Sequence, residues 1–100
     1  MIMRVNALMM DSTDNVVTCI SDIEVGQIVY YKVDDEIRRI IANEHIPYCH
    51  KIAINPIKKG EMVVKYGEII GRACNNIAEG YWVSHLNIES VLRDYTNELM

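Results

Sequence analysis

Three short segments of this chain share one pattern, in which an isoleucine, two further residues and a glycine lead into an apolar run. The segments are residues 23–29, 57–63 and 77–83. Glycine adopts positive φ angles without strain, so each segment predicts a tight turn followed by a β-strand. The intervals between the segments are unequal, at 34 and 20 residues, so the pattern is not a solenoid repeat. It predicts one compact fold that uses the same turn three times.

Turn residues also separate short apolar segments along the rest of the chain. The expected strands are residues 2–9, 16–20, 27–33, 36–42, 50–54, 61–66, 68–74 and 81–85. Residues 36–42 fit a short helix equally well by periodicity, but their β-branched side chains favour a strand. Many short strands at intervals of roughly ten residues predict an all-β fold. At the C-terminus, Asn87 could cap a helix over residues 88–99, because apolar residues recur there at helical spacing.

Length and composition exclude several classes of protein. One hundred residues predict a single domain, residues 1–100. The net charge of −4, without a Lys/Arg stripe, argues against nucleic-acid binding. No apolar run approaches about 18 residues and the N-terminus does not resemble a signal peptide, so no membrane segment is predicted. Three cysteines without CxxC spacing predict neither a disulfide framework nor a zinc knuckle, and the expected compartment is the reducing cytoplasm.

Positive charge is concentrated in residues 50–72, whereas the remainder of the chain is acidic. The basic residues of this segment are Lys51, Lys58, Lys59, Lys65 and Arg72, and its acidic residues are Glu61 and Glu68. Such an island suits an anionic substrate or an acidic surface of a partner protein. Lysines that protect exposed strand edges from aggregation would give the same pattern.

Several blocks resemble the SAF-type domain of the altronate/galactarate dehydratase family over residues 11–90. They are residues 14–16 (DNV), 22–26 (DIEVG), 50–54 (HKIAI), 59–61 (KGE), 65–73 (KYGEIIGRA) and 77–80 (IAEG). The resemblance implies a β-clip, a compact fold of bent hairpins. It also implies the N-terminal domain or separate small subunit of a sugar-acid hydro-lyase, similar to the alpha subunit of sulfolactate sulfo-lyase. In that family a larger subunit carries most of the active site, often with iron or another divalent metal such as manganese.

The first candidate site residue is His50, which lies in the block HKIAI. Histidine can transfer protons or bind a divalent metal, so we expect His50 to be catalytic and to be a metal ligand; a hydrogen-bonded structural histidine is the alternative. Lys51 alternates to the opposite face of the same strand, so the two residues are not expected to contact one ligand. The same alternation separates Cys49 from His50, and an apolar neighbourhood would leave Cys49 inert.

The candidate substrate-binding residues are Lys51, Lys65, Tyr66, Arg72 and Asn87. The guanidinium group of Arg72 has the planar fork that binds carboxylates, and the adjacent glycines allow a close approach of the backbone. In the alternative interpretation, the segment 65–72 is a hairpin whose glycines serve only the turn geometry.

The block before Asn87 departs from the family. Family members typically carry alternating histidines here, which would lie on one face of a strand. In this chain those positions hold Trp82, Ser84 and Leu86, and His85 lies between them. A displacement of one residue moves a side chain to the other face. His85 is therefore a second metal candidate only if a bulge reverses it, and we expect the isolated chain to hold no metal tightly.

Taken with the resemblance, the sequence predicts the small subunit of a hydro-lyase that acts on a sugar acid or another hydroxy acid. Such an enzyme removes a proton next to a carboxylate and expels the β-hydroxyl, which requires a base and is helped by a Lewis acid. This chain offers too few such groups, so we expect it to cap or complete an active site carried by the larger subunit. The alternative is a non-catalytic β-clip binding module that has lost the family's histidines. Formation of a homo-oligomer stays open.

Overall fold

The computed structural model describes residues 5–91 and contains nine short strands. They are β1 (Ala7–Leu8), β2 (Val16–Cys19), β3 (Ile28–Val33), β4 (Glu36–Ile41), β5 (Lys51–Ala53), β6 (Met62–Lys65), β7 (Glu68–Ala73), β8 (Trp82–Val83) and β9 (Ile88–Glu89). The all-β prediction is confirmed, and the segment 36–42 forms a strand rather than a helix. No helix able to cross a membrane occurs between residues 5 and 91.

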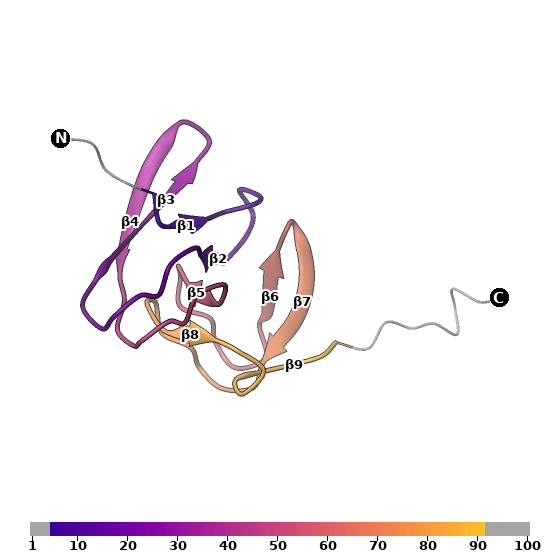
Figure 1. The fold of residues 1–100 in the computed structure, drawn as a ribbon. Coiled ribbons are helices and arrows are strands. Elements are labelled where there is room, and N and C mark those ends of the chain that lie inside the picture. Colours follow the sequence, from indigo (N-terminus) through magenta and orange to yellow (C-terminus); the bar gives the residue numbers. More distant parts are fainter. Residues whose placement is uncertain (1–4, 92–100) are drawn as a thin grey trace.

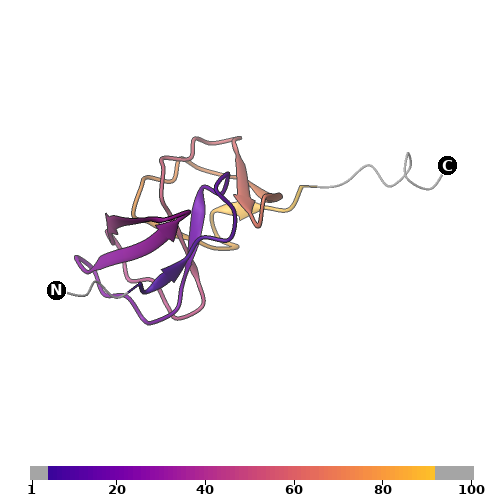
Figure 2. The ribbon, with the colours of Figure 1, turned by 90° about the horizontal axis from the view of Figure 1, so that it is seen from above.

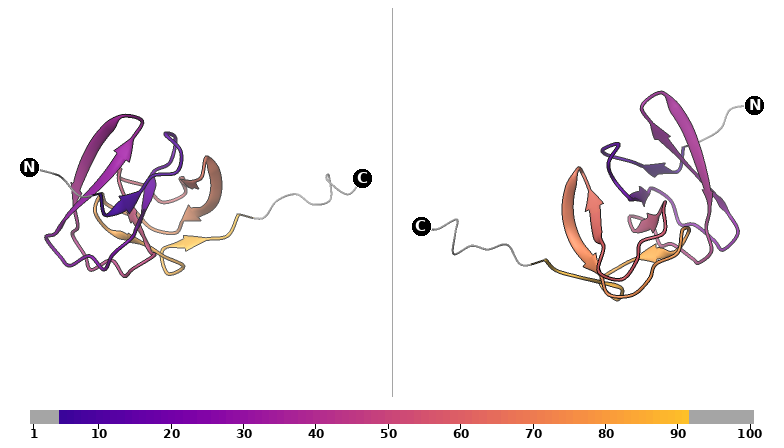
Figure 3. Two further views of the ribbon diagram at one scale, coloured as in Figure 1. Left: turned by 45° about the horizontal axis from the view of Figure 1, so that its top comes forward. Right: turned by 180° about the vertical axis from the view of Figure 1, so that it is seen from behind.

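The strands form three antiparallel sheets. A central sheet has the order β1-β2-β5-β8, β3 and β4 form a separate hairpin, and β9 extends the β6–β7 hairpin. Figures 1 and 3 show the two hairpins on opposite sides of the central sheet, with their tips pointing the same way. In Figure 2, β9 lies beside β7 at the end of the molecule away from β3 and β4.

The three predicted glycine turns are present, and the structure adds a fourth. Gly26, Gly60 and Gly80 have φ angles of +87°, +90° and +88°. Cys49 occupies the equivalent place in the fourth turn, with φ at +68°. There the amide of His50 donates to the carbonyl of Pro47 at 3.0 Å, which is the bond that closes each glycine turn. This turn was not predicted from the sequence, because the residue with the left-handed conformation is not a glycine.

The four turns reveal an internal duplication. Ile23 pairs with Ile46 through an antiparallel bridge, and Ile57 pairs with Ile77 in the same way. Each bridge closes a unit of turn, hairpin and turn, with β3–β4 in the first unit and β6–β7 in the second. Each unit then leads into a strand of the central sheet, β5 or β8, and these two strands pair with each other. The intervals of 34 and 20 residues are unequal because the segment from Ile23 to Ile57 contains the additional turn at residues 46–49.

The two units have separate hydrophobic cores on opposite faces of the central sheet. Ile23 and Ile46 belong to one buried cluster, together with Val17 of β2. Val16 belongs to the second cluster, which surrounds Ile57 and the β6–β7 hairpin. Because successive side chains of a strand point to opposite faces, β2 contributes to both clusters. The central sheet is thus the shared wall of the two units.

Cys49 provides a direct test of the fourth turn. Cys49→Gly should raise the free energy of unfolding by about 0.5–1 kcal/mol, because relief of the left-handed strain outweighs the greater entropy of glycine in the unfolded chain. Urea denaturation under reducing conditions measures the change. Cys49→Ala is the matched control, since it removes the thiol but keeps the Cβ atom. Equal stability of the two variants would contradict the assignment.

The predicted C-terminal helix does not begin at residue 88. Ile88 and Glu89 form β9, which pairs with Ala73 and Arg72 of β7. Asn87 folds back into the preceding loop, so it does not act as a helix cap. Ile88 packs against the second hydrophobic cluster, which explains why the chain continues along the sheet. The rest of the expected helix, residues 92–99, lies outside the described residues.

Candidate functional site

His50 lies immediately before β5 and contacts Trp82 of the neighbouring strand β8. The indole Nε1 of Trp82 donates a hydrogen bond to His50 Nδ1 at 3.2 Å, and the two rings meet edge to face with centroids 5.1 Å apart. An accepting Nδ1 places the proton of the neutral ring on Nε2. His50 is exposed, so this arrangement suits a proton or hydrogen-bond donor better than a metal ligand, which needs a free lone pair.

The side chain of Lys51 lies on the face of the central sheet opposite to that of His50, as strand alternation predicted. It lies directly opposite Thr18 of β2, so the two side chains share a face. Burial lowers the pKa of Lys51, and the positive charge of nearby Lys65 lowers it further. The hydroxyl of Thr18 is buried and finds no hydrogen-bond partner within residues 5–91. We call Thr18, Lys51 and Lys65 the lysine site.

The lysine site has the chemistry of an anion-binding site. A carboxylate placed beside Lys51 would offset the burial and the nearby positive charge of Lys65 that lower the pKa of Lys51. The hydroxyl of Thr18, which has no hydrogen-bond partner within residues 5–91, is inaccessible to solvent, so a carboxylate would accept from it only after a local side-chain movement. The sequence pointed to Lys51 and Lys65 through charge, whereas Thr18 emerges only from the register of β2 on β5.

Tyr66 and Gly67 form the tip of the β6–β7 hairpin, and Asp14 holds this tip. The Asp14 carboxylate is 3% exposed and accepts from the amides of Tyr66 at 3.0 Å and Gly67 at 2.8 Å. Lys65 Nζ lies 5.0 Å from the centre of the exposed Tyr66 ring. The backbone of the block KYGE therefore has a structural role, and its side chains remain available at the surface.

Arg72 and Asn87 have partners inside the chain. Arg72 Nε lies 3.2 Å from Glu89 Oε1, which links β7 to β9. The side chain of Asn87 accepts from the amide of Ser84 at 2.8 Å and donates to the carbonyl of Trp82 at 2.7 Å. Binding of substrate by these two residues stays a prediction, but any ligand must compete with these contacts.

The residues predicted to bind the family's metal do not assemble a donor set in this chain. Trp82 occupies the position beside His50 where the resemblance implies a histidine, and it offers no metal ligand. His85 lies exposed in the loop between β8 and β9. In the described part of the chain, neither His50 nor His85 belongs to a group of three potential ligands. Transition-metal sites usually use three or more protein ligands, so these histidines do not fit the family's metal by themselves.

A central sheet shared by two turn–hairpin–turn units, with His50 immediately before β5, Lys51 on β5 and Lys65 on β6, is the arrangement of an SAF-type β-clip domain. The family model described as the altronate/galactarate dehydratase SAF domain matches residues 5–91, and the chain belongs to this family.

Curated relatives differ in how much of their own length the chain spans. It is 34% identical over 82 residues to altronate dehydratase of Bacillus subtilis, covering 81% of this chain and 16% of that protein. It is 42% identical over 40 residues to galactarate dehydratase (L-threo-forming) of Escherichia coli, covering 40% of this chain and 8% of that protein. It is 30% identical over 92 residues to the (2R)-sulfolactate sulfo-lyase subunit alpha of Chromohalobacter salexigens, covering 89% of this chain and 95% of the subunit.

The reactivity of Cys19 and Cys49 tests the burial of these two thiols in the structure. Burial raises the pKa of the Cys19 thiol to about 11, whereas Cys49 is exposed, contrary to the apolar surroundings expected for it. Because the thiolate is the reactive form, Cys49 should react with a maleimide at least about 100-fold faster than Cys19 in the folded chain at neutral pH. Mass spectrometry after a labelling time course measures both rates. Comparable rates would contradict the burial of Cys19, whose labelling should require denaturant.

Proposed function

We propose that this chain is the small SAF-domain subunit of a cytoplasmic hydro-lyase that acts on a sugar acid or another hydroxy acid. The observation that carries the proposal is family membership combined with the extent of the match. The chain spans 95% of a relative that is named as a subunit, but only 16% of the altronate dehydratase. The likeness to the relative named as a subunit supports a small-subunit role, with a larger subunit supplying the rest of the active site.

His50 is the residue through which we propose that this chain contributes to the chemistry. Expulsion of a β-hydroxyl as water requires an acid that protonates the departing oxygen. The ring of His50 is exposed, and its hydrogen bond from Trp82 leaves the proton of the neutral ring on Nε2, which can donate a hydrogen bond to the departing oxygen. Full proton transfer passes through the imidazolium form, in which Nδ1 also carries a proton and the hydrogen bond from Trp82 is broken. Trp82 thus acts as a positioning residue, because it fixes the orientation and the tautomer of the histidine.

The lysine site lies on the other face of the central sheet, so we assign it a different contact. We propose that it binds an acidic side chain of the larger subunit. A half-buried lysine beside a second positive charge favours one desolvated carboxylate, and such charge pairs contribute to both the rate and the specificity of association. This assignment separates docking, through Lys51 and Lys65, from proton transfer, through His50.

Two readouts distinguish docking from substrate binding at the lysine site. If Lys51 docks the larger subunit, Lys51→Met should weaken subunit association at least about 10-fold and leave the KM of the saturated complex unchanged. If Lys51 binds substrate, the variant should raise KM without affecting association. Lys58→Met, a substitution at an exposed turn lysine, is the matched control for the loss of one positive charge.

Because residues 5–91 bring no complete acid–base set together, we expect the chain to be inactive alone. Purified chain should show no turnover above background with altronate, galactarate or sulfolactate in an assay that follows the keto product or released sulfite. Robust turnover by the isolated chain would refute the subunit role.

The second candidate function is a non-catalytic acid-binding module. It is favoured by one observation, that Trp82 stands beside His50 in place of a histidine. This reading predicts that the assembled protein binds a hydroxy acid but that His50→Gln leaves any activity of the larger subunit unchanged.

A further inference from the structure

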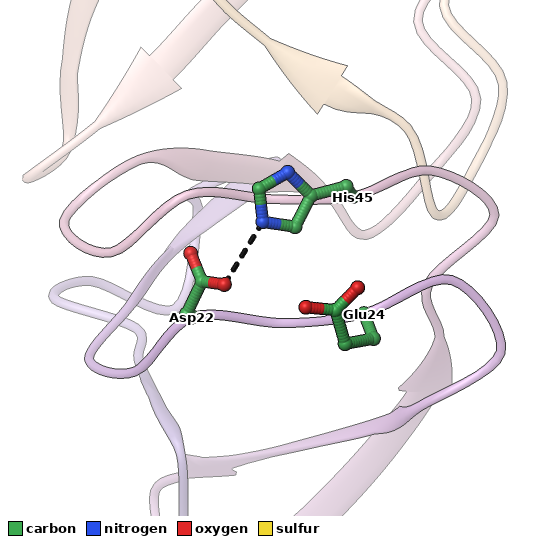
Figure 4. Close-up of side chains that lie close together, drawn as sticks. All are labelled: Asp22, Glu24 and His45. Carbon is green, nitrogen blue, oxygen red and sulfur yellow. Dashed lines mark hydrogen bonds and ion pairs between the residues drawn. The ribbon is translucent and has the colours of Figure 1, made fainter.

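A second cluster of chemically active side chains lies at the opening of the first turn–hairpin–turn unit, apart from His50 and the lysine site. Asp22 and Glu24 flank Ile23, and His45 precedes Ile46. Ile23 and Ile46 exchange two backbone hydrogen bonds, each 2.9 Å long, and both side chains are fully buried. Because residues on either side of an inward-pointing residue face outward, Asp22, Glu24 and His45 come together at the surface (Figure 4).

The three side chains are close enough to share one ion. Their ligand atoms all lie within 4.8 Å of one another. His45 Nε2 is 3.0 Å from Asp22 Oδ2, and Figure 4 shows the Glu24 carboxylate on the same side of the two segments. Ligands bound to one transition metal at about 2.1 Å lie up to about 4 Å apart, so small rotations of exposed side chains suffice. Two carboxylates and one imidazole are typical ligands of zinc, iron and manganese.

The duplicated architecture provides an internal control, because the fold does not require these residues. The equivalent positions in the second unit are Pro56 and Lys58, which flank Ile57, and Asn76, which precedes Ile77. Ile57 and Ile77 exchange the same pair of backbone bonds, at 2.8 and 2.7 Å. The turn and its bridge therefore form equally well without a carboxylate or an imidazole, so the first unit carries metal-binding chemistry that its geometry does not need.

We propose that Asp22, Glu24 and His45 bind one divalent transition-metal ion. The three protein ligands leave the remaining coordination positions to water, so the ion is exchangeable and its affinity lies in the micromolar range. Such a site agrees with the expectation that no tightly held metal survives exhaustive dialysis of the isolated chain. The ion would link the start of the first unit, at Asp22 and Glu24, to its end, at His45, which lies one turn before His50.

The experiment is a titration of the untagged full chain with zinc and then with cobalt. Zinc should bind with one equivalent and a Kd between about 1 and 50 μM, and raise the Tm by at least about 5 °C at 1 mM zinc. His45→Gln and Asp22→Asn should each weaken binding at least about 10-fold. His85→Gln is the matched control, since His85 is an exposed histidine outside the cluster, and its affinity should equal that of the unmodified chain.

Cobalt distinguishes this site from the exposed thiol of Cys49. Binding through oxygen and nitrogen gives visible d–d bands without the near-ultraviolet band of a cobalt–thiolate bond. A thiolate band that disappears in Cys49→Ser would assign the metal to cysteine and overturn the proposal. Equal affinity of His45→Gln and the unmodified chain would also overturn it. Binding weaker than about 1 mM would mean that the cluster is only an ion pair between His45 and Asp22.

Discussion

Asp14→Ala is expected to lower the free energy of unfolding by about 3 kcal/mol. The Asp14 carboxylate is 3% exposed and accepts from three backbone amides: Asp11 at 3.1 Å, Tyr66 at 3.0 Å and Gly67 at 2.8 Å. Removal of a buried acceptor leaves these donors unsatisfied, at about 1 kcal/mol or more for each. Two of the three belong to the tip of the β6–β7 hairpin, so the variant also releases the second unit from the turn before β2.

Urea denaturation of the two proteins measures this effect. Asp11→Ala is the matched control, because within residues 5–91 the Asp11 side chain bonds only to Thr13 in the same exposed turn and should contribute less than about 1 kcal/mol. A loss of less than 1 kcal/mol in Asp14→Ala would show that water replaces the carboxylate without penalty. That result would contradict the view that Asp14 fixes the hairpin tip.

His50→Gln is expected to lower the kcat of the assembled enzyme by about 100-fold, the range for loss of an acid–base group. Glutamine is polar and of similar length, so the variant removes the titrating group while keeping a side chain against Trp82. Folding should be unaffected, because His50 is exposed. Steady-state kinetics on the purified complex measures kcat and KM separately, and an unchanged kcat would leave His50 with only a structural role.

Two further variants sharpen the test of His50. Trp82→Phe removes the indole donor to His50 Nδ1 and should alter the pH profile of kcat, since the preferred tautomer of the ring is no longer fixed. A role for Trp82 in packing alone would lower stability and leave that profile intact. His85→Gln should match the unmodified enzyme, which excludes a general effect of histidine loss.

The strands were predictable where glycine, proline and β-branched residues marked their ends. β2, β3, β4, β6 and β7 lie within one or two residues of the expected ranges. Each of these strands is flanked by residues whose chemistry favours turns, so its ends could be predicted. The fourth turn was missed because Cys49 adopts a left-handed conformation that L-residues rarely take. Comparison of the two units exposes it, since residues 46–49 precede His50 as residues 77–80 precede Tyr81.

The candidate site was predictable only in part, because cross-strand neighbours depend on register. Alternation alone separated His50 from Lys51, and the structure places them on different faces. The proximity of Thr18 to Lys51 could not be predicted from the sequence, because it depends on the pairing of β2 with β5. Asp22 and His45 are 23 residues apart in sequence and meet only through the bridge between Ile23 and Ile46.

Ile88 and Glu89 show how local periodicity can mislead at the start of the expected helix. Ile88 begins a series of apolar residues at helical spacing, but the open edge of β7 offers backbone hydrogen bonds to the same residue. Pairing with β7 and packing on the second cluster outweigh a weak helix preference at this position.

The proposal that this SAF domain works as a subunit is tested most directly by co-expression with a dehydratase large subunit from the same genome. Size-exclusion chromatography should show the two chains in one peak, and turnover of a sugar acid or hydroxy acid should appear only in that peak. Lys51→Met should reduce co-elution, more so at high salt, whereas Lys58→Met should not. Independent elution of the two chains, or equal turnover by the large subunit without this chain, would contradict the account.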